Sequence, residues 1–141
     1  MEIYIDFQVS SKTANINLNS IFNKEGKFHC IGDVSKTGTI LDYSQWNLSF
    51  TPIETHDINE VASLFFEETY SLRKKIVKYL KKTDSELLIY FVVINYEGVN
   101  DYIHLDLSEE NIHKFSKFNA SISIDGLGWY EQTDALFFNL S

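Results

Sequence analysis

The sequence predicts an α+β fold: a single domain over residues 1–141, with a mixed, mostly antiparallel sheet of about six strands, one long helix and two short helices. Three patterns support this prediction. Apolar and polar side chains alternate over residues 2–9, as in a half-buried strand. Residues 57–82 carry an apolar stripe at helical spacing. Residues 87–94 form a continuous apolar run, typical of a strand buried on both faces.

The long helix is expected to begin at Asp57, because Glu60 three residues later completes the pattern of a capping box. Its acidic residues come early and its basic residues come late, as the helix dipole favours. The surrounding segment, residues 57–96, has a net charge of zero, so we interpret its basic cluster as a solvated helix face and not as an anion site. This cluster consists of Arg73, Lys74, Lys75, Lys78, Lys81 and Lys82.

Shorter elements follow from local patterns. Apolar residues at helical spacing before a glycine predict a short helix. Runs of strand-forming residues bounded by turn residues predict strands, and a segment rich in glycine, serine and threonine predicts a mobile loop. In chain order these elements are a helix at 16–22, strands at 27–31 and 45–51 around a loop at 32–44, a strand at 102–107 that forms a hairpin with 87–94, and a strand at 121–125.

The second short helix is expected to begin at Ser108, whose hydroxyl can cap it. Glu109 and Glu110 follow in the first turn, where the helix dipole favours acids. Leu107 and Ile112 occupy the two positions of a hydrophobic staple. The residues expected to face the core are Ile112, Phe115 and Phe118.

The charge of the chain restricts the kinds of molecule that it can bind. The net charge is −8, and residues 97–141 contain eight acids but only two bases, Lys114 and Lys117. An acidic surface repels phosphate backbones, so we expect no nucleic-acid partner. A basic protein is the natural complement of such a surface.

Other features indicate the compartment. One cysteine, Cys30, excludes an internal disulfide framework and favours a reducing, cytoplasmic environment. The N-terminal residues form a strand pattern and not a signal peptide. No run of 18 apolar residues occurs, so no membrane span is expected.

The sequence contains no recognisable set of catalytic residues. It has no nucleophile elbow, phosphate-binding loop or zinc-protease motif, so we expect neither enzyme activity nor a cofactor. The histidines lack ligand spacing, so no metal is expected. The alternative is a small ligand-binding or hydrolytic pocket formed by His104, Asp106 and His113.

The candidate recognition surface lies around the Gly-rich turn at residues 125–131. Trp129 and Tyr130 are suited to anchor an interface, because aromatic side chains supply much contact energy at low entropic cost. They equally fit a role in closing the core. The expected partner-binding residues are Asp101, Asp106, Glu109, Glu110, Asp125, Trp129, Tyr130, Glu131 and Asp134.

The order of elements and a few marker residues resemble a bacterial family of uncharacterised domains, DUF4279, over most of the chain to about residue 130. The family implies no activity. Size, charge and aromatic content are also similar, more loosely, to those of small acidic immunity proteins that neutralise bacterial toxins. The markers that carry the family resemblance are Gly32, Asp33, Trp46, Leu107, Ser108 and Asp125.

We therefore expect a binding protein whose partner is a basic toxin domain. A homo-oligomeric scaffold is a further alternative, because residues 132–141 are apolar enough to form an edge strand, pack on the sheet or mediate a homodimer. Leu136, Phe137 and Phe138 are the most apolar residues of this tail.

Overall fold

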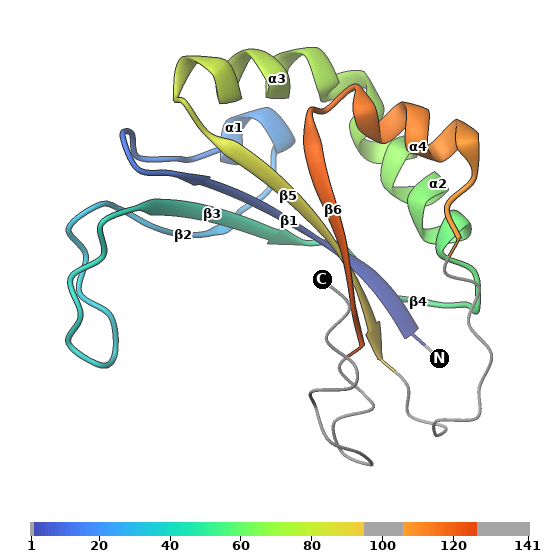
Figure 1. Ribbon diagram of the computed structural model, residues 1–141, viewed down its shortest axis with the longest axis horizontal. Helices are drawn as coiled ribbons and strands as arrows, with labels where there is room; N and C mark the ends of the chain where they lie inside the picture. Colours follow the sequence, from blue (N-terminus) through green and yellow to red (C-terminus); the bar gives the residue numbers. More distant parts are fainter. Residues whose placement is uncertain (1, 95–105, 127–141) are drawn as a thin grey trace.

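A computed structural model describes residues 2–94 and 106–126 of the chain. It has a six-stranded mixed sheet with helices on one of its faces (Figure 1), which confirms the predicted α+β class. The elements are β1 (Glu2–Ser11), α1 (Asn19–Phe22), β2 (Lys27–His29), β3 (Ser44–Ser49), β4 (Ile53–Glu54), α2 (Ile58–Thr69), the 3-10 turn η1 (Tyr70–Leu72), α3 (Arg73–Lys82), β5 (Glu86–Ile94), α4 (Glu109–Ser116) and β6 (Ala120–Gly126).

The strand order is β2-β3-β1-β5-β6, and the short β4 also pairs with β1. β1 pairs antiparallel with β3 and with β5, whereas β5 and β6 are parallel. Phe7 of β1 lies opposite Leu48 of β3 and Ile89 of β5, so one row of apolar side chains crosses three strands. The alternation in β1 puts its odd-numbered residues in the core and its even-numbered residues on the opposite face.

The predicted hairpin between residues 87–94 and 102–107 is wrong. Residues 102–105 lie outside the described part of the chain, and Leu107 is not in a strand. One edge of β5 is paired with β1 from Glu86 to Ile94, and the other with β6 from Leu87 to Val93. Both edges of β5 are therefore occupied. The pattern also differs from a strand buried on both faces, because most even-numbered residues of β5 are only half-buried.

The long helix is interrupted by a 3-10 turn, η1, between α2 and α3. Asp57 caps α2, because its carboxylate accepts a hydrogen bond from the Asn59 N–H at 2.9 Å. The predicted capping box is modified. The Asp57 N–H donates to the Thr55 hydroxyl at 3.1 Å, and that hydroxyl donates to the Glu60 carboxylate at 2.6 Å. Thr55 thus connects the two ends of the box.

The core is rich in aromatic rings between the sheet and the helices. Phe65 and Phe66 of α2 contact Phe115 of α4, with ring centroids 5.9 Å and 4.5 Å apart. Phe118, just after α4, contacts the same two rings. Phe7 approaches Phe65 from the sheet at 6.3 Å. This cluster fixes α4 to α2 and both helices to the sheet.

The other end of the core is organised by Trp46, which is fully buried as predicted. Its indole N–H donates to the Asn19 side-chain oxygen at 2.8 Å, and that oxygen also accepts the Gly26 N–H at 2.9 Å. A Cβ atom at Gly26 would lie 2.3 Å from the indole ring, so only glycine allows this approach.

Three smaller features of the structure differ from the sequence prediction. Leu64 was expected in the apolar stripe but points outward at the margin of the buried face. Residues 32–44, expected to be a mobile loop, contain a hydrogen-bonded turn with a bridge between Val34 and Ile40. The first short helix is one turn, α1; β2 and β3 end two residues earlier than predicted, whereas β1, β5 and β6 extend beyond their predicted bounds. The tail at 132–141 lies outside the described residues.

Phe65→Ala should reduce the free energy of unfolding by about 3–5 kcal/mol, because it leaves a cavity at the centre of the aromatic cluster. Its neighbour provides the control. Leu64 is 42% exposed whereas Phe65 is 3% exposed, so Leu64→Ala should cost less than about 1 kcal/mol. Urea denaturation of both variants measures the difference. Equal midpoints for the two variants would contradict the assigned core.

Candidate binding face

The structure separates the predicted partner-binding residues that it describes. Asp106, Glu109 and Glu110 lie just before or at the start of α4, within the helical layer. Asp125 lies on β6, next to Val92 on the face of the sheet that points away from the helices. These two groups therefore do not form one surface. Five further predicted residues lie outside the described part of the chain: Asp101, Trp129, Tyr130, Glu131 and Asp134.

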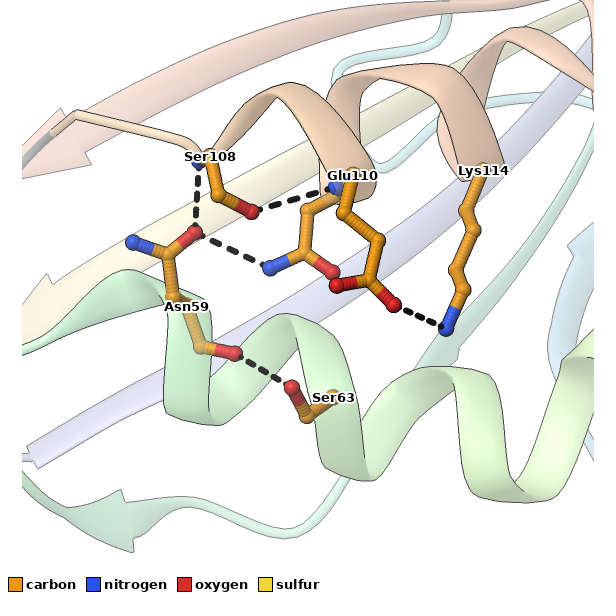
Figure 2. Close-up of polar contacts among 6 residues, drawn as sticks. Asn59, Ser63, Ser108, Glu110 and Lys114 are labelled. Carbon is orange, nitrogen blue, oxygen red and sulfur yellow. Dashed lines mark hydrogen bonds and ion pairs between the residues drawn. The ribbon is translucent and has the colours of Figure 1, made fainter.

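The start of α4 is held by a polar junction with α2 (Figure 2). The Asn59 side-chain oxygen accepts the Ser108 N–H at 2.8 Å and an N–H of the Asn111 amide at 2.9 Å. The Asn59 amide nitrogen donates to the Asp106 carbonyl at 2.9 Å. Ser108 caps α4 as predicted, accepting the Asn111 N–H at 3.2 Å. A part-buried pair of side-chain amides, Asn59 and the buried Asn111, thus joins the two helices.

The prediction that Ile112 faces the core is wrong. Ile112 is 53% exposed, whereas its neighbour Asn111 is buried. The hydrogen bond from Asn111 to Asn59 fixes the rotation of α4 and turns Ile112 outward. In the same turn Glu110 forms an exposed ion pair with Lys114 at 3.4 Å. The acids at this helix start therefore have a local structural role, favoured by the helix dipole.

No helix among the described residues covers the other face of the sheet (Figure 1). The alternate residues of the strands point there, away from the core, and most of them are polar or tyrosine. β5 adds three aliphatic side chains to the same face, Leu88, Val92 and Ile94, of which Val92 is only 5% exposed. We call this surface the acidic face. Its central residues are Tyr4, Asp6, Gln8, Asn47, Ser49, Tyr90, Ser123 and Asp125.

Charge on the acidic face is strongly one-sided. Among the described strand residues that point to this side, the only Lys or Arg is Lys27, on the edge strand β2. The carboxylates come from four strands, so they are spread over the sheet. They are Glu2, Asp6, Glu54, Glu86 and Asp125. The face therefore presents a negative potential over most of its width.

Asp6, Tyr90 and Asp125 form the centre of the acidic face. Asp6 accepts a 2.5 Å hydrogen bond from the Ser49 hydroxyl and lies directly opposite Tyr90 in the β1–β5 register. Burial raises the pKa of Tyr90 above its ordinary value of 10.0, and the negative charges of Asp125 and Asp6 raise it further. The nearby negative charges therefore favour the neutral form of the Tyr90 hydroxyl, which is a hydrogen-bond donor.

Residues 30–43, which we call the apolar hairpin, extend from the sheet edge to the side away from the helices (Figure 1). Backbone hydrogen bonds from Gly32 to Leu41 and from Leu41 to Asp33, both 2.8 Å, hold it together. Ile31, Val34 and Ile40 are nevertheless exposed, the last two at 66% and 71%. Exposed apolar side chains on a rigid turn are typical of a protein-binding site.

Neither the acidic face nor the apolar hairpin was predicted from the sequence. The alternation over residues 2–9 could have placed Asp6 on the outward face, because Ile5 and Phe7 beside it are apolar. Val34 and Ile40 were hidden in a segment dominated by turn residues. Their exposure depends on the hairpin geometry, which a polar composition does not reveal.

The alternative pocket gains no support from the described residues. His104 lies outside them, and Asp106 and His113 are exposed. Over residues 2–94 and 106–126, no three side chains of His, Cys, Asp or Glu lie close enough together to hold a metal ion. His29 lies against the Tyr43 ring at 4.9 Å, where its Nδ1 atom is buried without a hydrogen bond. That environment is structural, at the end of the edge strand β2.

Comparison with known proteins gives one match. The model of the family described as a domain of unknown function, DUF4279, matches residues 3–128. The chain therefore belongs to this family, as its marker residues indicate. No curated protein and no solved structure matches it. In the part of the chain that the structure describes, no helix is both long and apolar enough to cross a membrane.

The raised pKa of Tyr90 predicts a pH dependence of stability. The unfolded chain loses this proton near pH 10.0, before the folded protein does. The stability that Tyr90 contributes is therefore fully present below pH 10.0 and is lost as the pH rises through the raised pKa. Tyr90→Phe should show a smaller loss of unfolding free energy between about pH 9 and about pH 11. Asp125→Asn should lower the pKa of Tyr90 toward its ordinary value.

Urea denaturation across this pH range measures the first effect, and the ultraviolet absorbance of tyrosinate measures the second. The wild-type minus Tyr90→Phe difference spectrum isolates Tyr90 from the other seven of the eight tyrosines. Identical pH profiles for the wild type and Tyr90→Phe would show that the acidic face does not perturb this group.

Proposed function

We propose that this protein is a non-catalytic binding protein that neutralises a basic toxin domain by direct contact in the cytoplasm. The observation that carries the proposal is that the apolar hairpin projects from the β2–β3 edge of the sheet to the same side as the acidic face (Figure 1). Val34 and Ile40 supply apolar anchors at the β2–β3 edge, and Asp6 on β1 and Asp125 on β6 supply negative charge across the sheet. Stable protein interfaces combine such anchors with a polar surround.

The chemistry of the partner follows from the charge. A toxin that acts on nucleic acid has a positively charged active-site groove, and carboxylates spread over a sheet can occupy that groove in place of phosphates. The long-range field of the acidic face would steer such a partner and would weaken with salt, because the screening length is about 10 Å at 0.1 M. Tyr4 and Tyr90 add aromatic contact area on the same side.

The proposal moves the binding site away from the start of α4. Glu109 and Glu110 were expected to contact the partner, but they lie in the helical layer with the Asn59 junction. Asp125 retains its predicted place in the site. Asp6, Tyr90 and the apolar hairpin are added to it.

Co-expression with the toxic domain of a secreted protein encoded beside this chain tests the proposal. Wild-type protein should restore growth, and the purified pair should form a complex. Val34→Ser combined with Ile40→Ser should raise Kd by about tenfold or more, which is about 1.4 kcal/mol. Ile112→Ser is the matched control, because Ile112 is similarly exposed at 53% but lies in the helical layer. It should leave Kd unchanged.

A second pair of variants tests the charge. Asp6→Asn with Asp125→Asn and Glu109→Gln with Glu110→Gln each remove two negative charges from the protein. The first double variant should slow association and reduce its salt dependence, whereas the second should bind like the wild type. Cells that die equally fast with and without this protein would refute neutralisation. Equal effects of the two double variants would refute the acidic face as the site.

A further inference from the structure

A second charged surface lies on the helical layer, away from the acidic face. The outer side of α3 and the C-terminal end of α4 form a shallow groove with a volume of about 520 Å³. Tyr70 and Val77 give it a partly apolar floor. Its cationic side chains come from both helices, and they are Arg73, Lys74, Lys78, Lys81 and Lys117. We call this surface the basic groove.

These five cations are uncompensated. Among the residues that the structure describes, none of them forms an ion pair with a carboxylate. Of the acids in the same chain segment, four lie on α2 or at its N-cap, Asp84 follows α3 and lines a neighbouring pocket with Lys81, and Glu86 lies on β5. Glu60 accepts from Thr55, and Glu68 pairs with Lys24 at 2.7 Å. The zero net charge of residues 57–96 therefore conceals the separation of early acids from late bases, and the fold adds Lys117 to the bases of α3.

The helix dipole does not account for the whole groove. It favours cations near the end of α3, such as Lys81, but not at its start, where Arg73 and Lys74 lie. Lys117 belongs to a different helix and is brought there by the packing of α4 on α2. Gathering five like charges costs repulsive energy, and a bound anion relieves that repulsion.

Contacts with Tyr70 hold the guanidinium group of Arg73 in a position from which it can bind an anion. Its guanidinium lies over the Tyr70 ring, 4.2 Å from the centroid, and its Nη1 atom donates to the Tyr70 carbonyl at 2.8 Å. This leaves the rest of its planar donor fork for bidentate contact with a phosphate. The surrounding lysines act as mobile point charges. Such a donor set matches a ligand with several phosphates in a row.

We propose that the basic groove binds an oligophosphate, meaning three or more linked phosphates, either free or carried by a nucleoside. The groove volume falls within the range of about 300–1,000 Å³ typical of small-molecule sites. The net charge of −8 disfavours a long nucleic acid but is a weaker obstacle to a compact ligand seated among five cations. This site is independent of the acidic face and of the proposed function.

Calorimetric titration of the full chain at about 0.1 M salt, where the screening length is about 10 Å, tests the proposal. The probes are inorganic tripolyphosphate, ATP and a single-stranded oligonucleotide. Tripolyphosphate and ATP should both bind. Equal affinities would mean that the phosphates alone are recognised. At least tenfold tighter binding of ATP would mean that the nucleoside also uses the floor formed by Tyr70 and Val77.

Lys78→Gln with Lys117→Gln should weaken binding of both ligands at least tenfold. Both lysines are exposed, so the melting temperature should not change. Lys12→Gln with Lys36→Gln removes the same charge from exposed positions outside the basic groove and should have no effect. The proposal is overturned if neither tripolyphosphate nor ATP binds at millimolar concentration, if both double variants weaken binding equally, or if the oligonucleotide binds more tightly than either.

Discussion

The parallel pairing of β5 with β6 is the constraint on which the rest of the structure depends. Parallel neighbours cannot be joined by a tight turn, so the chain has to cross over between them, and it does so through α4. Phe115 and Phe118 pack this crossover on α2, and the Asn59 junction fixes its rotation. All described helices lie on one face of the sheet, and the other face carries mostly polar and tyrosine side chains, together with the aliphatic residues Leu88, Val92 and Ile94 of β5.

This division places many of the acidic and basic side chains on different surfaces of the molecule. The strands carry their carboxylates on the acidic face, while α2, α3 and α4 with their caps contain eight Lys and Arg residues and six acidic residues. The net charge of −8 for the whole chain therefore does not indicate the local charge of the acidic face or of the basic groove. Two binding modes can then coexist on one small domain: apolar anchors with steering carboxylates on one side, and a compact basic groove on the other. Their physical requirements are opposite, and the sheet keeps them apart.

Sequence reasoning succeeded where the determining interactions are local. The cap at Ser108, the start of the long helix at Asp57 and the burial of Trp46 and Phe65 follow from spacing over a few residues. It failed where the partner of a segment lies far along the chain. One edge of β5 pairs with β6 and not with the residues that follow β5 in the sequence, and no local sequence pattern predicts this pairing.

The candidate site shows the same limit. Asp125 was identified from composition, but its neighbours Asp6 and Tyr90 come from distant strands. Lys117 joins Arg73 and Lys78 only because α4 packs on α2. Asn111, not Ile112, faces the interior, where it donates a hydrogen bond to Asn59 of α2. Each of these sites is created by tertiary contacts.

Disulfide trapping tests the parallel pairing most directly. In a Cys30→Ser background, Leu88→Cys and Ser121→Cys place two thiols at Cα partners of the parallel register. Leu88→Cys with Asp125→Cys is the control, because these positions meet only if the strands run antiparallel about Tyr90 and Ser123. In the parallel register they are four residues apart along the strand, about 13 Å, which is too far for a disulfide. The account predicts rapid crosslinking of the first pair alone, and preferential crosslinking of the second pair would contradict it.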